Sequence, residues 1–244
     1  MSRKVIMING SFRKKNTHNV LVQIGKLLDK YDFETEIINL FDYNIKDCTG
    51  CDDLCVEKGS CTLDDDMRMI MQKIMDSDGV VLGSPVYMGG VTSKFKAFAD
   101  RTKEWFNKPD LAGIPALFVL TTGITGVKDT LRFLKQFATG FGARLGGSVT
   151  RTSANYDLPV RENEMLQFLS LLQTDKRNYK PSTNEVVTFQ VQKVLALNLG
   201  GDSRKFWEEK NWIDKYYYYD CQIGFFKKIF SRKMFGILSR AMSS

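Results

Sequence analysis

The sequence contains no apolar run long enough to cross a membrane. No window of the 244 residues approaches the roughly 20 apolar residues that a membrane-spanning helix requires. The apolar stretch at residues 5–8, near the amino terminus, is also far shorter than the core of a signal peptide. We therefore expect a cytoplasmic protein.

Two nucleotide-binding motifs are absent from the loop after the first apolar stretch, and histidine is scarce. That loop has neither the Gly-Lys-Ser/Thr signature of a P-loop nor Gly-x-Gly-x-x-Gly, which argues against an NTPase and against a dinucleotide cradle there. The single histidine, His18, has no candidate catalytic partner in the sequence, so we expect no acid–base role for it.

The composition is that of a globular protein with an excess of positive charge. Hydrophobic residues make up 43% and charged residues 26% of the chain, so disorder does not dominate. The formal net charge of +7 suits an anionic ligand such as a phosphate ester, but it suits nucleic acid or acidic lipid equally well.

The first 150 residues alternate between short apolar runs and segments of helical periodicity. The runs predict strands at residues 5–9, 35–40, 79–82, 114–120 and 144–150. The periodic segments predict helices after Asn16 and over residues 65–75, 92–106 and 128–141. This alternation predicts a doubly wound α/β fold, with a five-stranded parallel sheet in the flavodoxin-like order 2-1-3-4-5. Ligands of such sheets bind beyond the carboxyl ends of the strands, so the loops after Asn9, Leu82 and Leu120 should build the site.

The loop at residues 10–19 has the composition of an anion-binding loop. Its hydroxyls, side-chain amides and backbone N–H groups lie before a helix, whose amino terminus carries a partial positive charge. The alternative is that Asn16 or Thr17 is only a helix cap and Arg13 only a surface charge.

The loop at residues 83–93 is suited to a planar ring. Pro85 stiffens the turn after the strand, while Gly89 and Gly90 allow a close approach of the backbone. Tyr87 offers an aromatic face. In the helix that follows, we expect Phe95 and Phe98 in the core, and Asp100 and Arg101 as a helix-end ion pair.

Residues 83–102 closely resemble the NADPH-dependent FMN reductase family of the flavodoxin-like superfamily. The shared pattern is Gly-Ser-Pro-Val-Tyr-x-Gly, ending in Lys-Ala-Phe-x-Asp-Arg-Thr. The first loop is similar to the family's Gly-Ser-Pro-Arg-Lys…Asn-Thr, although Phe12 replaces the proline and the Asn-Thr pair arrives one residue early. The resemblance covers about residues 3–150 of this chain.

The resemblance implies an NAD(P)H-dependent oxidoreductase that binds FMN. A hydride would pass from the nicotinamide to N5 of FMN and on to an unknown small-molecule or electron-carrier acceptor, with no compulsory catalytic side chain. The FMN phosphate would be held by Ser11, Arg13, Asn16 and Thr17. The isoalloxazine would be lined by Pro85, Val86, Tyr87, Met88 and Gly89, and its far edge by Thr121, Thr122 and Gly123.

Four of the five cysteines form the compact motif Cys48, Cys51, Cys55 and Cys61. In a reducing cytosol such a set indicates metal binding or redox activity rather than a disulfide framework. The motif is similar to that of the iron-sulfur flavoproteins, which implies a [4Fe–4S] cluster and, as an alternative function, an electron carrier fed by ferredoxin.

Other interpretations of this motif stay open. Asp52, Asp53 and Glu57 lie inside it, and their charge opposes an anionic cluster. Zinc or free thiols in a cap over the flavin pocket would also suit the motif. In each case we expect the loop to cross the carboxyl edge of the sheet, near the dimethylbenzene end of the flavin.

The alternation ends near residue 158. We divide the chain into a flavodoxin-like FMN-binding domain, residues 1–155, and a helical C-terminal extension, residues 156–244, with helices over 160–173 and 185–199. Residues 222–244 carry five cations and no acid, with apolar positions at helical spacing: Phe226, Ile229, Phe230, Met234, Ile237 and Leu238. This tail would lie on an anionic membrane or, as we favour, dock on the domain or on a second subunit. We expect a homo-oligomer; no motif supports nucleic-acid binding.

Overall fold

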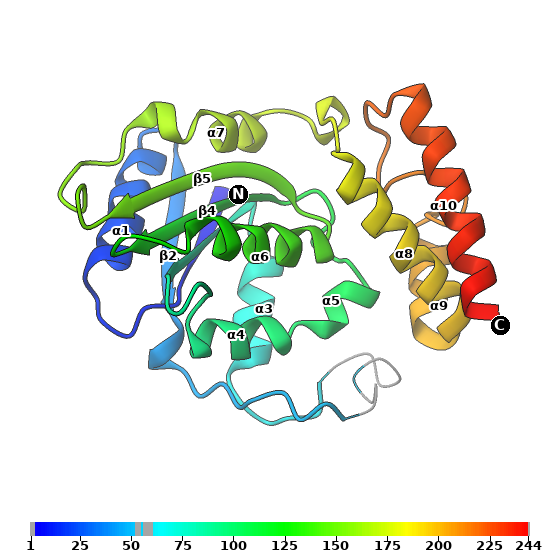
Figure 1. Cartoon of the computed structure of the whole chain (residues 1–244), viewed down its shortest axis with the longest axis horizontal. Helices are drawn as coiled ribbons and strands as arrows, with labels where there is room; N and C mark the ends of the chain where they lie inside the picture. Colours follow the sequence, from blue (N-terminus) through cyan, green and yellow to red (C-terminus); the bar gives the residue numbers. More distant parts are fainter. Residues whose placement is uncertain (1–2, 52–54, 56–60, 244) are drawn as a thin grey trace.

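A computed structural model of the protein describes residues 3–51, 55 and 61–243. At its centre lies a parallel sheet with the strand order β2-β1-β3-β4-β5, which confirms the predicted flavodoxin-like fold (Figure 1). Every residue of the central strand β3 and of its neighbour β4 is buried, as expected of a sheet covered on both faces. The five strands are β1 (Arg3–Asn9), β2 (Phe33–Asn39), β3 (Gly79–Pro85), β4 (Pro115–Thr122) and β5 (Arg144–Thr152).

Helices cover both faces of the sheet. Alternate residues of β1 point to opposite faces, so Val5 and Met7 belong to one core cluster, and Ile6 and Ile8 to the other. Within the described ranges, no helix is both long and apolar enough to cross a lipid bilayer. The first face is covered by α1 (Asn16–Asp29) and α7 (Leu166–Gln173), and the second by α3 (Met67–Met75), α4 (Ser93–Asp100), α5 (Lys103–Asn107) and α6 (Val127–Gly140).

The helix predicted over residues 92–106 is broken into α4 and α5 at Arg101. The predicted pairing of Asp100 with Arg101 is wrong, because Asp100 instead accepts from Lys96 Nζ at 2.7 Å. Arg101 is buried and forms an ion pair with Asp65, with 2.5 Å between Nη1 and Oδ2. The predicted core positions of Phe95 and Phe98 are confirmed.

Helix α7 is shorter than predicted but packs closely on the sheet. A helix was predicted over residues 160–173. Only the second half of this range is α-helical, and it follows a single 3₁₀ turn, η2 (Glu162–Glu164). At Gly146 of β5, an added Cβ would come within 2.8 Å of Phe168 Cδ2, so the glycine lets this ring approach the strand. A boundary at residues 155 and 156 would separate α7 from the sheet that it covers. We therefore propose that the sheet domain continues to Gln173.

The remaining helices form a separate aromatic cluster at the amino-terminal edge of the sheet (Figure 1). Trp207 Nε1 donates to the carbonyl oxygen of Asn107 at 2.9 Å, and Gln192 Nε2 donates to that of Gly140 at 2.5 Å. These bonds fix the extension to the ends of α5 and α6. Its elements are η3 (Lys176–Asn178), α8 (Thr183–Leu199), α9 (Gly201–Glu209), which periodicity did not predict, and α10 (Phe225–Ser243).

We expect Phe168→Ala to lower the free energy of unfolding by about 3–5 kcal/mol, because it leaves a cavity between α7 and the sheet. Leu166→Ala on the same helix is the matched control: Leu166 is 57% exposed, so its loss should cost no more than about 0.5 kcal/mol. Urea unfolding of both variants measures the difference. Equal effects would mean that α7 is not part of the sheet core.

Candidate functional site

Hydrogen bonds join the loops after β1, β3 and β4 at the carboxyl edge of the sheet. The backbone N–H of Gly10 donates to the carbonyl oxygen of Gly83 at 2.8 Å, and that of Val86 donates to Thr121 at 2.8 Å. Thr92 Oγ1 donates to the carbonyl oxygen of Gly10 at 2.7 Å. The three predicted site loops therefore meet as the parallel topology requires.

Between these loops lies a cavity of about 670 Å³, including its open mouth. This volume falls within the range typical of cofactor pockets. Of the twelve residues predicted to contact flavin, the structure brings ten to the cavity wall, whereas Met88 and Gly89 lie outside the lining; two further residues, Lys15 and Tyr156, were not predicted. The ten are Ser11, Arg13, Asn16, Thr17, Pro85, Val86, Tyr87, Thr121, Thr122 and Gly123.

The amino terminus of α1 opens into this cavity without a side-chain cap. Lys15 occupies the N-cap position, and no side chain in the described part of the protein caps the helix there. The alternative that Asn16 or Thr17 is the cap is therefore wrong. The first turn carries no acidic residue, and Arg13 and Lys15 line the same wall. Free N–H groups, a helix dipole and two cations together form an anion-binding site.

Hydroxyl groups shape the wall of this anion site. Ser11 Oγ donates to the carbonyl oxygen of Arg13 at 2.8 Å, and the backbone N–H of Ser11 donates to Asn9 Oδ1 at 3.1 Å. Thr17 Oγ1 and Thr121 Oγ1 lie 2.6 Å apart and are both buried. This contact ties the start of α1 to the end of β4.

The loop after β3 projects a tight turn past the cavity. Tyr87 and Gly90 exchange two backbone hydrogen bonds of 2.9 and 3.0 Å. Between them, Met88 and Gly89 have φ values of 50° and 75°, and the Met88 side chain is fully exposed at the tip. Their predicted contact with flavin stays a prediction. Tyr87 is 52% exposed and reaches both the cavity and the solvent.

Tyr156 comes from the loop after β5. Its hydroxyl donates to the carbonyl oxygen of Thr122 at 2.6 Å, and Ser153 Oγ donates to that of Gly123 at 2.7 Å. The rule that sites form at the carboxyl ends of strands applies to the fifth strand too, so the loop after β5 could have been predicted as a fourth site loop. Lys15 lies within the predicted first loop.

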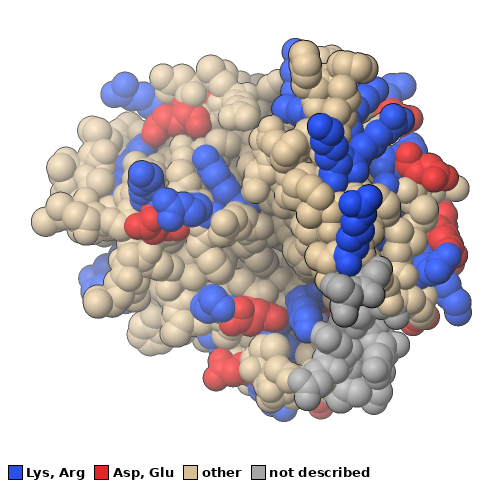
Figure 2. All heavy atoms as spheres, turned by 45° about the vertical axis from the view of Figure 1, so that its right-hand side comes forward, with Lys and Arg blue, Asp and Glu red and all other residues tan. Residues whose placement is uncertain are grey.

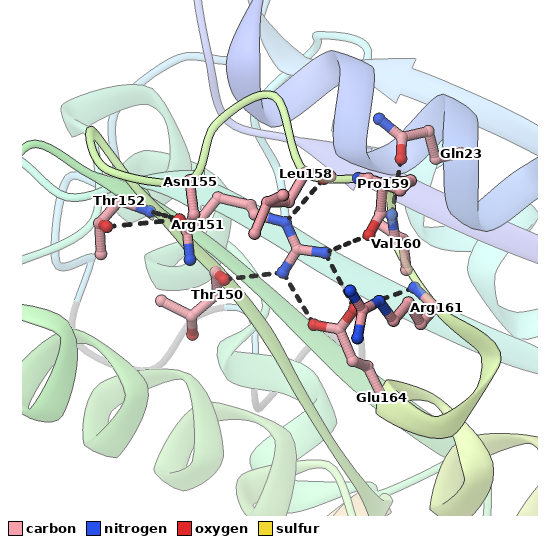
Figure 3. A network of polar contacts seen from close by, with 10 residues as sticks. All are labelled: Gln23, Thr150, Arg151, Thr152, Asn155, Leu158, Pro159, Val160, Arg161 and Glu164. Atoms are coloured by element: carbon pink, nitrogen blue, oxygen red, sulfur yellow. Dashed lines mark hydrogen bonds and ion pairs between the residues drawn. The ribbon is translucent and has the colours of Figure 1, made fainter.

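Arg151 anchors the loop that carries Tyr156 (Figure 3). Its buried guanidinium donates to both carboxylate oxygens of Glu164, at 2.8 and 2.9 Å, and to the carbonyl oxygens of Leu158 and Pro159. Arg151 holds the pKa of the Glu164 carboxyl below its ordinary value. This network holds the two ends of the loop together.

The cysteine motif surrounds a different cavity. Cys48, Cys51, Cys55 and Cys61 all line it, but it shares no lining residue with the first cavity. Asp100, Arg101, Lys103 and Glu104, at the junction of α4 and α5, complete its wall. The cysteines therefore do not line the predicted flavin cavity, and their place near the dimethylbenzene end of the flavin stays a prediction.

Helix α4 separates the two cavities. Its N-cap, Thr92, bonds to the first site loop, and its last residue, Asp100, lines the cysteine cavity. Helix α4 has eight residues and is therefore about 12 Å long, which is the approximate separation of the two cavities along it. Asp52, Asp53 and Glu57, which we expected to oppose a cluster, lie outside the described residues.

Polar contacts of the buried Arg101–Asp65 pair hold the two ends of the cysteine loop together. Arg101 Nη1 donates to the carbonyl oxygen of Lys46 at 2.8 Å as well as to Asp65, and the backbone N–H of Lys46 donates to Asp65 Oδ2 at 2.9 Å. Burial raises the pKa of the Cys55 thiol, Cys51 raises it further, and Lys103 opposes them. Among the residues that the structure describes, no three His, Cys, Asp or Glu side chains are arranged to hold a metal ion.

The sheet order and the anion site at the first helix define a flavodoxin-like protein. The family model of NADPH-dependent FMN reductases matches residues 3–156. The chain belongs to this family, and with it to the FMN-dependent oxidoreductases.

Two solved structures show the same fold at low sequence identity. A structure of RosB with a bound 8-demethyl-8-formylriboflavin-5'-phosphate intermediate has 14% identity and a TM-score of 0.54, over 71% of this chain and 77% of that one. The apo form of an NADH:FMN oxidoreductase, EMOB, has 18% identity and a TM-score of 0.51, over 70% of this chain and 86% of that one.

Curated relatives include several iron-sulfur flavoproteins. One from Archaeoglobus fulgidus is 42% identical over 100 residues, 41% of this chain and 49% of the relative. Another, from Methanocaldococcus jannaschii, is 40% identical over 101 residues, 41% of this chain and 52% of the relative. In both cases the chain spans about half of the relative's length. A further A. fulgidus iron-sulfur flavoprotein is 28% identical over 226 residues, covering 86% of this chain and 100% of that protein.

We expect Glu164→Gln to lower the free energy of unfolding near pH 7 by about 1–3 kcal/mol, as for other hydrogen bonds to charged groups. The folded-state pKa of Glu164 is depressed, so its stabilisation is present above the unfolded pKa of about 4.3 and is lost as the pH falls through the folded value. The difference between wild type and variant should therefore shrink in acid. Glu34→Gln, at an exposed position, is the control, and urea denaturation of each protein is measured at each pH. If the difference in free energy of unfolding between wild type and Glu164→Gln did not change with pH, the ion pair would not have the role assigned to it.

Proposed function

We propose that the protein is an FMN-dependent oxidoreductase that takes electrons from NADH or NADPH and passes them to a small-molecule or electron-carrier acceptor. The observation that carries this proposal is the uncapped amino terminus of α1, which opens into the cavity at the carboxyl edge of the sheet. FMN joins a phosphate to a planar ring, and the cavity offers an anion site beside a partly apolar wall.

The residues of the first loop fit a phosphate ester. A phosphate monoester carries three acceptor oxygens and close to two negative charges at neutral pH. Arg13, Lys15 and Asn16 supply donors beside the free N–H groups of the first turn. The hydroxyls of Ser11 and Thr17, each held by a contact within the protein, border this group of donors. The cations and the free N–H groups of the first turn match the acceptor oxygens of the ligand.

The other wall fits a flat ring system. It is formed by Pro85, Val86 and Tyr87 together with Thr121, Thr122 and Gly123, which follow the neighbouring strands β3 and β4. At Gly126 an added Cβ would lie 2.7 Å from Val86 Cγ1, so the third loop packs tightly against the second and stiffens this wall. Rigid walls of this kind would orient a ring without large rearrangement.

Bound FMN would supply the redox chemistry, by accepting a hydride from reduced nicotinamide and releasing one or two electrons. The described residues that line the cavity include no carboxylate, histidine or cysteine. The chain's own role is therefore to bind the phosphate, orient the ring and leave the mouth open to a second ring beside Tyr87. No side chain is proposed as a proton donor.

We expect the double variant Ser11→Ala/Thr17→Val to weaken FMN binding by about 1–3 kcal/mol, because it removes two hydroxyls from the phosphate site. Fluorescence titration of the apoprotein with FMN measures the loss. Riboflavin, which has no phosphate, is the matched ligand, and its affinity should stay the same. An equal loss for both flavins would indicate a damaged fold, and no loss for FMN would refute the phosphate site.

We expect NADPH or NADH to bleach the bound flavin in stopped-flow mixing. Tyr87→Leu should raise the half-saturating nicotinamide concentration about two- to tenfold, since an aromatic contact contributes roughly 0.5–1.5 kcal/mol. Tyr87→Phe keeps the ring and should behave like wild type. If neither nicotinamide reduces the flavin while reduced ferredoxin does, the protein is an electron carrier instead.

A second proposal concerns the four cysteines, which would hold a [4Fe–4S] cluster. In support, all four thiols line one cavity, Arg101 and Lys103 stand beside it, and several relatives are named iron-sulfur flavoproteins. The other two charged residues of the wall, Asp100 and Glu104, balance these cations, so the charged side chains of the wall add no net negative charge beside a thiolate-bound cluster. The cluster would supply single electrons about one helix length from the flavin, which favours the ferredoxin-fed carrier as the alternative function.

Anaerobically purified wild-type protein should contain about four iron and four acid-labile sulfide per chain, as a cubane requires. Cys51→Ser should lower both values, whereas Cys221→Ser, which alters a cysteine outside the motif, should leave them unchanged. Four reactive thiols without iron or sulfide would leave a flavin enzyme with free thiols. Zinc in place of iron would identify a zinc site.

We also propose a cytoplasmic, homo-oligomeric protein without a nucleic-acid partner. A reducing compartment would keep the four neighbouring thiols available for metal. Exposed apolar side chains near the cavity mouth, at Phe12, Met88 and Ile124, favour contact with another protein surface. Sedimentation velocity of the FMN-loaded protein would measure its oligomeric state.

A further inference from the structure

Helix α10 exposes most of the apolar residues that were predicted to dock it. Phe226, Ile229, Phe230 and Ile237 are exposed, and so is Phe225 at the start of the helix. The helix does pack on α8, but through another side, where Ser231 is fully buried. The helix thus packs on α8 of the extension, and the predicted apolar face is not the one that makes this contact. Docking of that face on a second subunit stays a prediction.

The exposed apolar side chains are concentrated in the first two turns. Phe225 and Phe226 are 72% and 85% exposed, and Ile229 and Phe230 follow at 40% and 41%. Residues three and four apart share one side of a helix, so Phe226, Ile229 and Phe230 form one continuous strip. The strip continues through Lys233 to Ile237.

Cations flank this strip along the helix, and its own segment contains no acid. Residues 222–244 contain Lys227, Lys228, Arg232, Lys233 and Arg240 but neither Asp nor Glu. Figure 2 shows Lys and Arg side chains spread over the part of the surface formed by the C-terminal helices.

Two of these cations are held at one flank of the strip. Lys228 Nζ and Arg232 Cζ lie 5.7 and 5.4 Å from the centre of the Tyr216 ring. They are therefore held beside the apolar strip and do not cover it, while Lys233 interrupts it with a flexible side chain.

From this arrangement, we propose that the first turns of α10 dock the protein on an anionic lipid bilayer. Aromatic and aliphatic side chains would enter the boundary between headgroups and acyl chains, and the cations would contact anionic headgroups. A second copy of α10 would bind this surface less well, because its five cations would repel the five cations of the first copy. Nucleic acid would use the cations but leave Ile229 and Ile237 without a role.

Docking through α10 is compatible with the redox site. In Figure 1, α10 lies on the outer side of α8, at the amino-terminal edge of the sheet, whereas the cavity lies at the carboxyl edge. A bilayer against α10 would therefore leave the mouth of the cavity open to water.

Co-sedimentation of the full-length, FMN-loaded protein with lipid vesicles tests this proposal. We expect binding to vesicles of phosphatidylcholine mixed with phosphatidylglycerol, little binding to phosphatidylcholine alone, and weaker binding at high salt. Phe226→Ser/Phe230→Ser and Lys228→Gln/Lys233→Gln should each lower the partition coefficient about tenfold or more. All four positions are exposed, so the variants should keep the wild-type circular dichroism spectrum.

Matched variants control for charge and for exposed apolar area. Lys26→Gln/Lys135→Gln removes two exposed lysines of α1 and α6, and Leu166→Ser removes an exposed side chain of α7; both should bind like wild type. Absence of binding to anionic vesicles, or equal binding to both vesicle types, would overturn the proposal. So would a gel shift with RNA or DNA that the α10 variants abolish, or a dimer that only those variants dissociate.

Discussion

The open amino terminus of α1 is the constraint around which the site is arranged. A helix end at the base of a cavity, with free N–H groups and two cations, is unfavourable without an anionic partner. The protein shapes the surroundings of this end with its own contacts. Ser11 fixes the first loop, and the contact of Thr17 with Thr121 joins the helix to β4. Each contact fixes part of the wall near the place where a phosphate would lie.

Helix α4 connects the candidate site at the carboxyl edge of the sheet to the cysteine loop. Thr92 at its start contacts the loop after β1, and Arg101 at its end holds the base of the cysteine loop. The Arg101–Asp65 pair is almost fully buried, and loss of one partner of such a pair leaves an uncompensated charge. The shape of the cysteine cavity therefore depends on a helix whose other end contacts the first loop of the candidate site.

Local patterns in the sequence predicted most of the fold. Apolar strands alternating with amphipathic helices indicate a parallel sheet, and the carboxyl-edge rule located the three site loops. Of the twelve residues that the family resemblance implied, ten line one cavity. The failures depend on distant contacts. The break at Arg101 follows from its pairing with Asp65, which lies 36 residues away. In α10, periodicity located the apolar side chains but could not show that Ser231, and not Phe230, faces α8.

The central claim is that the first turn of α1 binds the phosphate of FMN as a dianion. The ³¹P NMR resonance of FMN bound to the protein, followed between about pH 5 and 8, tests it most directly, because the second pKa of a phosphate monoester is about 6. Donors at a helix amino terminus favour the dianion. We predict a single resonance, at the dianion position, that does not move across this range. A resonance that titrates like that of free FMN would contradict the account.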